Sequence, residues 1–483
     1  MSDRGSFQKA EVEASLVDER RSVTAKLACF NINAVRVASW RESNFTDPVQ
    51  QLHAKTLRFP GGTVANYWDW KRGGVIQDTS RLPRGLPNFL RYKARRYKAG
   101  GLEELQAGLD LTDTAPIFVL NLLTSNIKSQ IEMLRTASEL GIPVQHIELG
   151  NEFYFNIPNY KKFFPRPEDY AATARRWIAA IRQEFPEAKI SVVGVAPDPQ
   201  KPERLQHWNR LLLNQVADRA DAISLHIYGR HGLDSQVDPE LEYPFFTAEE
   251  VSIILGEPFR VWQTTRERDA YQRIPNNMER WITEYNYIEK ATVPGQEFEQ
   301  RVVGSWTHGL YALEMALLFL EDPRVTTICN HDLIGNSMFT AVHLSELPET
   351  ENAGSFKFSA TGLTLQLFNE AIAGMTEAQQ IDFSPGELLQ GQDNFRYPAL
   401  YGWRFSNEDE QRALIINLSE QRVTVNLENL MLEGAEYKQL YADPRTLVED
   451  SRSVEQEQGA ASQTLELAPY AITKLSIQLP ESQ

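Results

Sequence analysis

A regular alternation of short apolar runs and longer helix-like segments between about residues 26 and 375 constrains the fold more than any other feature. The apolar runs have the length and composition of buried strands, and the segments between them carry apolar residues at helical spacing. The expected strands are 27–33, 55–59, 117–122, 146–152, 189–195, 221–227, 279–283 and 325–330. The expected helices are 48–53, 127–140, 167–185, 203–217, 247–272, 298–321 and 359–374. Eight strands that alternate with helices predict an α/β fold, a closed (β/α)8 barrel.

The pattern changes after residue 376, where short alternating strands are separated by turn signals. They are expected at 401–405, 412–418, 422–427, 437–441, 464–467 and 471–479. Such a pattern is typical of an antiparallel β-sandwich. Residues 9–26 read as one or two short strands that have no other partner and should complete it. The predicted organisation is therefore 1–25 joining the sandwich, 26–375 forming the barrel, and 376–483 forming the sandwich.

Two of the barrel strands are expected to end on carboxylates. Glu152 closes the run 146–152, and Glu284 follows the aromatic and β-branched run 281–283. Barrel enzymes keep their chemistry at the carboxyl ends of the strands. Two carboxylates facing one another there could act as proton donor and nucleophile, which is what glycoside hydrolysis requires. The plainer alternative for either residue is a surface ion pair.

An ordered set of motifs resembles the retaining glycoside hydrolases of clan A. The set comprises Arg58-Phe59-Pro60-Gly61-Gly62, then Asn151-Glu152, then the pair His226 and Tyr228, and finally Glu284. The family 51 arabinofuranosidases are the most similar, followed by the family 79 glucuronidases and heparanases, and the resemblance covers roughly residues 25 to 375. It implies that Glu152 is the acid/base and Glu284 the nucleophile of a double displacement.

The same resemblance implies a set of substrate-binding and supporting residues. Arg58 would hold Glu284 ionised, Tyr228 would donate a hydrogen bond to it, and Asn151 would bind the hydroxyl next to the reacting carbon. The predicted substrate-binding set is Arg58, Asn151, His226, Tyr228, Trp68, Tyr154 and Asn286. Four have structural alternatives: a salt bridge for Arg58, a loop cap for Asn151, a core histidine for His226, and a loop anchor in place of sugar stacking for Trp68. Glu148, four residues before Glu152, reads as a polar barrel residue rather than a third catalyst.

Departures from the family pattern affect the expected sugar. Thr63 stands where family 51 has an asparagine, and Asn31 and Asn33 stand in place of its strand 1 glutamate. A pyranoside is therefore at least as good a candidate as an arabinofuranoside. A basic run, Arg91, Lys93, Arg95, Arg96 and Lys98, is either a solvated helix face or a site for a uronate or sulfate on the substrate.

Composition excludes several other classes. A net charge of −16 argues against nucleic acid as a partner, and no run reaches 18 apolar residues, so no membrane association is expected. Residues 1–21 are charged and lack an apolar leader core, which predicts a cytoplasmic location unless a native leader has been removed. No metal-ligand spacing occurs among the histidines and cysteines, so neither a metal nor a cofactor is expected.

Only two cysteines occur, Cys29 and Cys329, which fits a reducing compartment. They fall on the first and last barrel strands, which are neighbours in a closed barrel. We interpret them as two buried small hydrophobic residues in preference to a redox pair.

The sequence therefore predicts a retaining glycoside hydrolase that acts on a plant or microbial oligosaccharide or polysaccharide. The alternatives are a carbohydrate-binding protein on a barrel that has lost catalysis, and a transglycosylase using the same residues. The sequence leaves the oligomeric state open.

Overall fold

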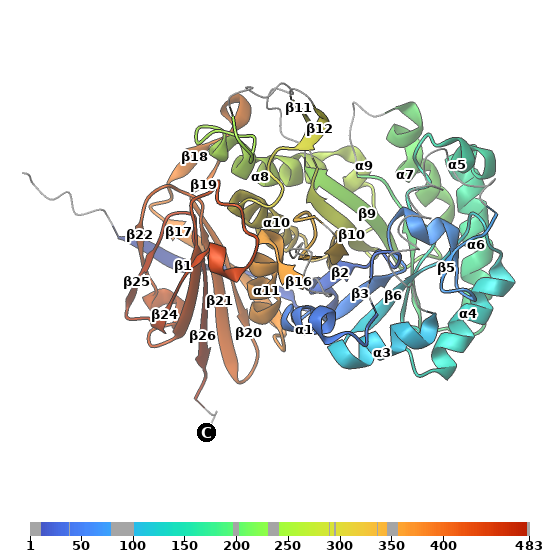
Figure 1. Cartoon of the computed structure of the whole chain (residues 1–483), viewed down its shortest axis with the longest axis horizontal. Coiled ribbons are helices and arrows are strands. Elements are labelled where there is room, and N and C mark those ends of the chain that lie inside the picture. Colours follow the sequence, from blue (N-terminus) through green and yellow to red (C-terminus); the bar gives the residue numbers. More distant parts are fainter. Residues whose placement is uncertain are drawn as a thin grey trace, which may run out of the picture.

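The computed structural model describes residues 11–37, 39–78, 101–196, 202–229, 241–288, 290–293, 296–335, 337–344 and 356–480. It has two parts lying side by side, a barrel surrounded by helices and a large β-sheet (Figure 1). Both parts were predicted.

Eight parallel strands close into the predicted barrel, in the order β10-β13-β2-β3-β6-β7-β8-β9. Their bounds are β2 Cys29–Asn31, β3 Thr56–Phe59, β6 Ala115–Val119, β7 His146–Glu148, β8 Lys189–Val193, β9 Ala222–Gly229, β10 Glu279–Tyr287 and β13 Val325–Asn330. Each falls within or overlaps an expected strand. All eight carboxyl ends therefore point to one face of the barrel.

Helices surround the barrel and pack their apolar side chains against it. The main ones are α1 Ser43–Gln51, α3 Leu102–Thr112, α4 Ile127–Glu139, α6 Pro167–Arg182, α7 Glu203–Val216, α8 Val251–Glu267, α10 Trp306–Phe319 and α11 Ala360–Ile372, with the short α5 Pro158–Phe163 and α9 Asp269–Gln272. In α4, the Asn126 side chain accepts the Ser129 backbone N–H, and Ile131 and Leu134 are buried. The chain leaves this helix at Gly141, whose φ of 84° suits a residue without a Cβ.

The helix expected over 298–321 is shorter than predicted. Residues Gln296–Gln300 instead form β12, which pairs with β11, Lys290–Val293. The helix α10 begins at Trp306, after the Ser305 hydroxyl caps the backbone N–H of His308. Every residue of α10 is buried, because the helix lies between the barrel and the sheet. The signals in the sequence are Pro294-Gly295, a turn dipeptide, and Gly304-Ser305, a helix stop followed by an N-cap residue, and the expected helix ran through the second of them.

The second part is a nine-stranded sheet, ordered β24-β23-β26-β21-β20-β17-β1-β22-β25. Its strands are β1 Val12–Ser22, β17 Glu377–Ser384, β20 Leu400–Ser406, β21 Glu410–Asn417, β22 Val423–Asn426, β23 Glu436–Tyr441, β24 Glu455–Ala460, β25 Thr464–Leu467 and β26 Ile472–Gln478. One core contains residues from β22 and β25 at one end and from β21 and β26 nearer the other, so the sheet folds over itself as a sandwich.

The N-terminal strand belongs to this sheet. β1 pairs antiparallel with β17 and parallel with β22, and it lies among the orange and red C-terminal strands in Figure 1. It is one strand with an irregularity between Leu16 and Arg20. The chain therefore passes through the sheet first, forms the barrel, and returns.

Minor elements fill the connections. They are strands β4 Trp68–Asp69, β5 Gly74–Val75, β14 Ile334–Gly335, β15 Val342–Leu344, β16 Phe356–Phe358, β18 Leu388–Gln390 and β19 Arg396–Pro398, with 3-10 turns at Ala25–Leu27, Thr63–Tyr67, Gln392–Asn394, Glu428–Leu430 and Ser451–Ser453.

The cysteine interpretation was wrong. Cys29 and Cys329 do lie opposite one another on the neighbouring strands β2 and β13, as expected, but they form a disulfide rather than two free thiols. The cysteines consequently no longer support the expectation of a reducing compartment. The two cysteines are 300 residues apart in the sequence, and the predicted barrel already placed them on adjacent strands. Only the register between those strands brings their side chains face to face.

Candidate active site

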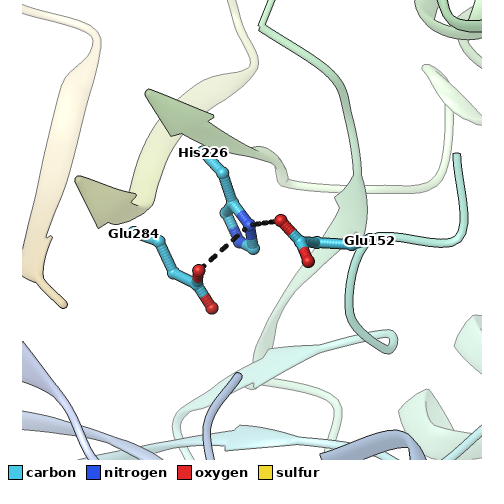
Figure 2. Close-up of side chains that lie close together, drawn as sticks. All are labelled: Glu152, His226 and Glu284. Carbon is cyan, nitrogen blue, oxygen red and sulfur yellow. Dashed lines mark hydrogen bonds and ion pairs between the residues drawn. The ribbon is translucent and has the colours of Figure 1, made fainter. Parts of the chain in front are cut away.

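Three titratable side chains meet at the carboxyl ends of the barrel strands. They are Glu152, which follows β7, His226 on β9, and Glu284 on β10. A carboxylate oxygen of each glutamate and a ring nitrogen of the histidine all lie within 4.8 Å of one another. Figure 2 shows the imidazole between the two carboxylates. The sequence expectation that Glu152 and Glu284 come together is therefore met in space.

Glu284 is surrounded by hydrogen-bond donors. Arg58 Nη1 donates to Oε1 at 2.8 Å, and the Tyr228 hydroxyl donates to Oε2 at 2.7 Å. Burial by itself would raise the pKa of Glu284, but the charges of His226, His331 and Arg58 outweigh it and hold that pKa well below the usual range. Glu284 is therefore an ionised carboxylate.

A β-bulge in β10 turns two consecutive side chains toward the site. Ile282 pairs with Leu225, whereas Glu284 pairs with His226, so Thr283 is an extra residue in the ladder. In a regular strand the side chains of Thr283 and Glu284 would point to opposite faces. With the bulge, Thr283 Oγ1 lies 3.2 Å from Glu148 Oε1 while Glu284 reaches Arg58. Bulges next to active sites commonly re-aim side chains in this way.

Glu152 lies in a loop and not at the end of a strand, which corrects the predicted strand 146–152. The β7 ladder ends at Glu148, and Gly150 follows with φ 93°. Glu152 itself has φ 52°, a left-handed conformation that few residues with a Cβ adopt. Strained backbone of this kind persists where the surroundings demand it, often at functional sites.

A hydrogen-bond chain connects Glu152 to a buried ion pair. Glu148 Oε2 accepts from Arg58 Nε at 2.6 Å, and its Oε1 accepts the proton of the Thr283 hydroxyl. Since that hydroxyl has no second proton, its oxygen must accept from His226 Nε2, 3.2 Å away. The other ring nitrogen, Nδ1, faces Glu152 Oε1 at 2.9 Å.

The hydrogen-bond chain from Glu148 through Thr283 and His226 places one proton between His226 and Glu152. Since Nε2 carries a proton, the 2.9 Å contact between Nδ1 and Glu152 Oε1 needs one further proton, which either of these two atoms can carry. Burial lowers the pKa of His226, but the charges of Glu284 and Glu152 outweigh it and raise that pKa. Glu152 and His226 thus share one proton beside the ionised Glu284. The structural alternatives of a surface ion pair for Glu152 and a core histidine for His226 do not describe this arrangement.

Asn151 and Tyr154 contact Glu152 or its neighbours directly. Asn151 Oδ1 accepts from Arg58 Nη2 at 2.8 Å, and its Nδ2 lies 3.4 Å from Glu152 Oε2. The Tyr154 hydroxyl donates to Glu152 Oε1 at 3.1 Å. The pKa of Tyr154 is raised, mainly by burial and further by the charges of Glu152 and Glu284, so its hydroxyl keeps its proton. Tyr154 therefore orients Glu152.

Two residues of the predicted substrate-binding set, Trp68 and Asn286, are buried and contact other parts of the protein. Trp68 is buried and packs edge-on against Phe59 with ring centroids 5.7 Å apart, so it anchors its loop. Asn286 is fully buried, donates to the backbone carbonyls of His331 and Phe339, and accepts from His308 Nε2 at 2.9 Å. Sequence position at a strand end does not reveal that a side chain is already saturated by its own loops.

Sequence reasoning missed Thr283 and His331. His331 directly follows β13, so the rule that singled out Glu152 and Glu284 would also have found it. Thr283 reaches Glu148 and His226 only because of the bulge, which has no signal in the sequence. The basic run Arg91, Lys93, Arg95, Arg96 and Lys98 lies outside the described residues.

The same three groups, Glu152, His226 and Glu284, have the chemistry of a divalent metal site. Both oxygens of Glu284 already accept hydrogen bonds, and the guanidinium of Arg58 lies 2.8 Å from one of them. A fixed positive charge at that distance opposes a second cation. The predicted lack of a metal and of a cofactor stays a prediction.

Solved structures of glycoside hydrolases share this architecture over nearly the whole chain. A family 51 α-L-arabinofuranosidase from Bifidobacterium longum matches with a TM-score of 0.71 and 13% identity over 97% of this chain and 99% of that one. The GH51 arabinofuranosidase from Xanthomonas axonopodis pv. citri gives 0.71 and 15% over 96% and 99%. A 4-O-α-L-rhamnosyl-β-D-glucuronidase from Fusarium oxysporum gives 0.60 and 14% over 97% and 99%.

These matches agree with the resemblance drawn from the motifs, and at such low identity they establish the fold, a (β/α)8 barrel with an accessory β-sandwich. No protein-family model matches the sequence, and no curated protein matches it either. Among the helices of the described residues, none combines the length and the apolar character that crossing a bilayer requires.

Proposed function

We propose that the protein is a retaining glycoside hydrolase, with Glu284 as nucleophile and Glu152 as general acid and base. The observation that carries the proposal is the separation of the two carboxylates, whose nearest oxygens lie within 4.8 Å. Retaining enzymes hold their two carboxyl groups about 5 to 5.5 Å apart, whereas inverting enzymes leave about 6.5 to 9.5 Å for a water.

The protonation states support the same division of roles. In the first step the Glu284 carboxylate attacks the anomeric carbon, the bond to the leaving oxygen breaks, and the Glu152 carboxyl gives its proton to that oxygen. In the second step the Glu152 carboxylate takes a proton from water, the water oxygen attacks the same carbon, and the ester bond to Glu284 breaks. Two inversions leave the anomeric configuration unchanged.

Supporting residues fit each step. Arg58 and Tyr228 hold Glu284 ionised before attack, and the tyrosine hydroxyl keeps its proton because burial, and then the charge of Glu284, raises its pKa. His226 holds the shared proton at Glu152, and Asn151 connects Arg58 to Glu152. The substrate class is an oligosaccharide or polysaccharide.

The test is a panel of aryl glycosides, with the configuration of the first-formed product followed by NMR. We expect turnover of at least one glycoside with retention, and a covalent adduct on Glu284 when a 2-deoxy-2-fluoro analogue of that glycoside is used. Inversion, or an adduct on another residue, would contradict the assignment. Binding of the same glycosides without turnover would favour the carbohydrate-binding alternative.

A further inference from the structure

His331 lies next to the proposed nucleophile and partly reaches solvent. Its side chain is 17% exposed, and its Nδ1 is 3.9 Å from Glu284 Oε2. A Cβ added to Gly62 would lie 3.6 Å from His331 Cε1 and 4.0 Å from Glu284 Oε1. The missing side chain of Gly62 therefore leaves room between the histidine and the nucleophile.

The hydrogen bonds of Asn31 fix the tautomer of His331. Arg58 can only donate, so the atom of Asn31 that it contacts at 2.8 Å must be the amide oxygen. The amide nitrogen of Asn31 then faces His331 Nδ1 and must donate to it. With Nδ1 as the acceptor, the proton of a neutral His331 is on Nε2.

The Nε2–H group of His331 has no hydrogen-bond partner in the described parts of the chain, whereas Nδ1 is occupied by Asn31. The ring is held edge-to-face by Tyr228 and Phe339, with centroids 6.3 and 6.1 Å away. A fixed donor with a free N–H group beside a nucleophile is suited to hold an oxygen of the substrate.

The charge around this donor determines whether it can bind a hydroxyl or a carboxylate of the sugar. Arg58 forms ion pairs with both Glu148 and Glu284, which leaves the trio with one net negative charge. Asp332, next to His331, is paired with Arg36 at 3.4 Å. A carboxylate on the bound sugar would be repelled here, whereas a hydroxyl would not.

We infer that His331 donates from Nε2 to a hydroxyl of the sugar unit whose anomeric carbon Glu284 attacks, and that this sugar is uncharged. The inference rests on the proposed function for the role of Glu284 and adds the substrate class to it. Asn31 acts as the positioning residue that sets the tautomer.

The experiment measures binding and so does not depend on turnover. The probes are glucose, galactose, mannose, xylose and arabinose, their monodeoxy analogues, and glucuronic acid, titrated by saturation-transfer NMR. We expect wild type to bind at least one neutral sugar and to bind one of its monodeoxy analogues about fivefold to tenfold more weakly. In His331→Ala that difference should disappear, because the donor and the hydroxyl belong to one hydrogen bond.

Two further variants make the result specific. His331→Gln keeps an N–H donor and should retain part of the discrimination, and His207→Ala, at an exposed position of α7, should behave as wild type. An unchanged discrimination in His331→Ala, tighter binding of glucuronic acid than of glucose, or binding of no neutral sugar would each overturn the inference. Failure of the aryl glycoside panel alone would overturn only the proposed function.

Discussion

The strand β10 carries a glutamate at each end of the barrel, and the two glutamates differ in the groups that surround them. Glu279, at its amino end, is contacted by Lys26 at 3.1 Å, by Lys189, by the Thr326 hydroxyl at 2.6 Å and by Trp281 Nε1 at 2.9 Å. Burial would raise its pKa, but the two lysines and the hydrogen bonds lower it to about 2. All four partners donate to the carboxylate of Glu279, so this carboxylate is fixed in its ionised state.

Glu284, near the carboxyl end of the same strand, also has a lowered pKa, but its surroundings contain a second carboxylate. His226 contacts both Glu152 and Glu284, at 2.9 and 3.5 Å. A displaced pKa therefore marks both ends of the barrel and does not by itself identify a catalytic site. The distinguishing feature is a pair of carboxylates, one ionised and one sharing a proton.

The largest expected effect is on Glu284. Glu284→Ala should lower kcat by about 10⁴-fold or more, since no nucleophile remains, and azide should restore turnover with an inverted product. Stopped assays on an aryl glycoside, with product configuration by NMR, measure both. A rate near that of wild type would place the nucleophile elsewhere.

Glu152→Ala should lower the rate most for substrates whose leaving group needs a proton most. For a leaving group of high pKa we expect a loss of about 10² to 10⁴-fold, and for an activated aryl leaving group a much smaller loss in the first step. Azide should then give a product of retained configuration. A loss that does not vary with the pKa of the leaving group would exclude Glu152 as the proton donor.

Glu279→Gln is the matched substitution at the other end of β10, and it should change stability without changing kcat. Because the pKa of Glu279 is lowered from 4.5 to about 2, its stabilisation is present above about pH 4.5 and is lost as the pH falls toward 2. We expect the free energy of unfolding at pH 7 to drop by about 2 kcal/mol, less than for a fully buried pair because Lys189 is half exposed.

Denaturant unfolding across pH 3 to 7 measures this change, where the variant should have a flatter pH dependence than wild type. A reduced kcat at unchanged stability would show that the two ends of β10 are not independent.

Thr283→Val should have the smallest effect, about tenfold or less in kcat/KM. Without the hydroxyl, Nε2 of His226 loses its acceptor, the other tautomer becomes accessible, and Glu152 holds its proton less firmly. The basic limb of the pH profile of kcat/KM should therefore move to lower pH. The control is Thr327→Val, because the buried hydroxyl of Thr327 has no hydrogen-bond partner among the residues that the structure describes. Identical profiles for both variants would remove the relay from the mechanism.

The alternation along 26–375 predicted the barrel, because strand and helix periods are local properties of the sequence. Carboxylates at strand ends predicted Glu152 and Glu284, because parallel strands bring their carboxyl ends to one face. The family resemblance supplied Arg58 and Tyr228, and both do contact Glu284.

Only the tertiary structure decided the remaining features. The bulge at Thr283 and the disulfide between Cys29 and Cys329 depend on the register between strands that are distant in the sequence, and the burial of Trp68 depends on how its loop packs against Phe59. Asn286 and His331 both stand near strand ends, yet Asn286 is saturated by hydrogen bonds and His331 keeps an N–H group that no described residue accepts. Residue type and spacing determine which face of the barrel carries the polar groups, but hydrogen bonds between distant segments determine which of those groups can still bind a substrate.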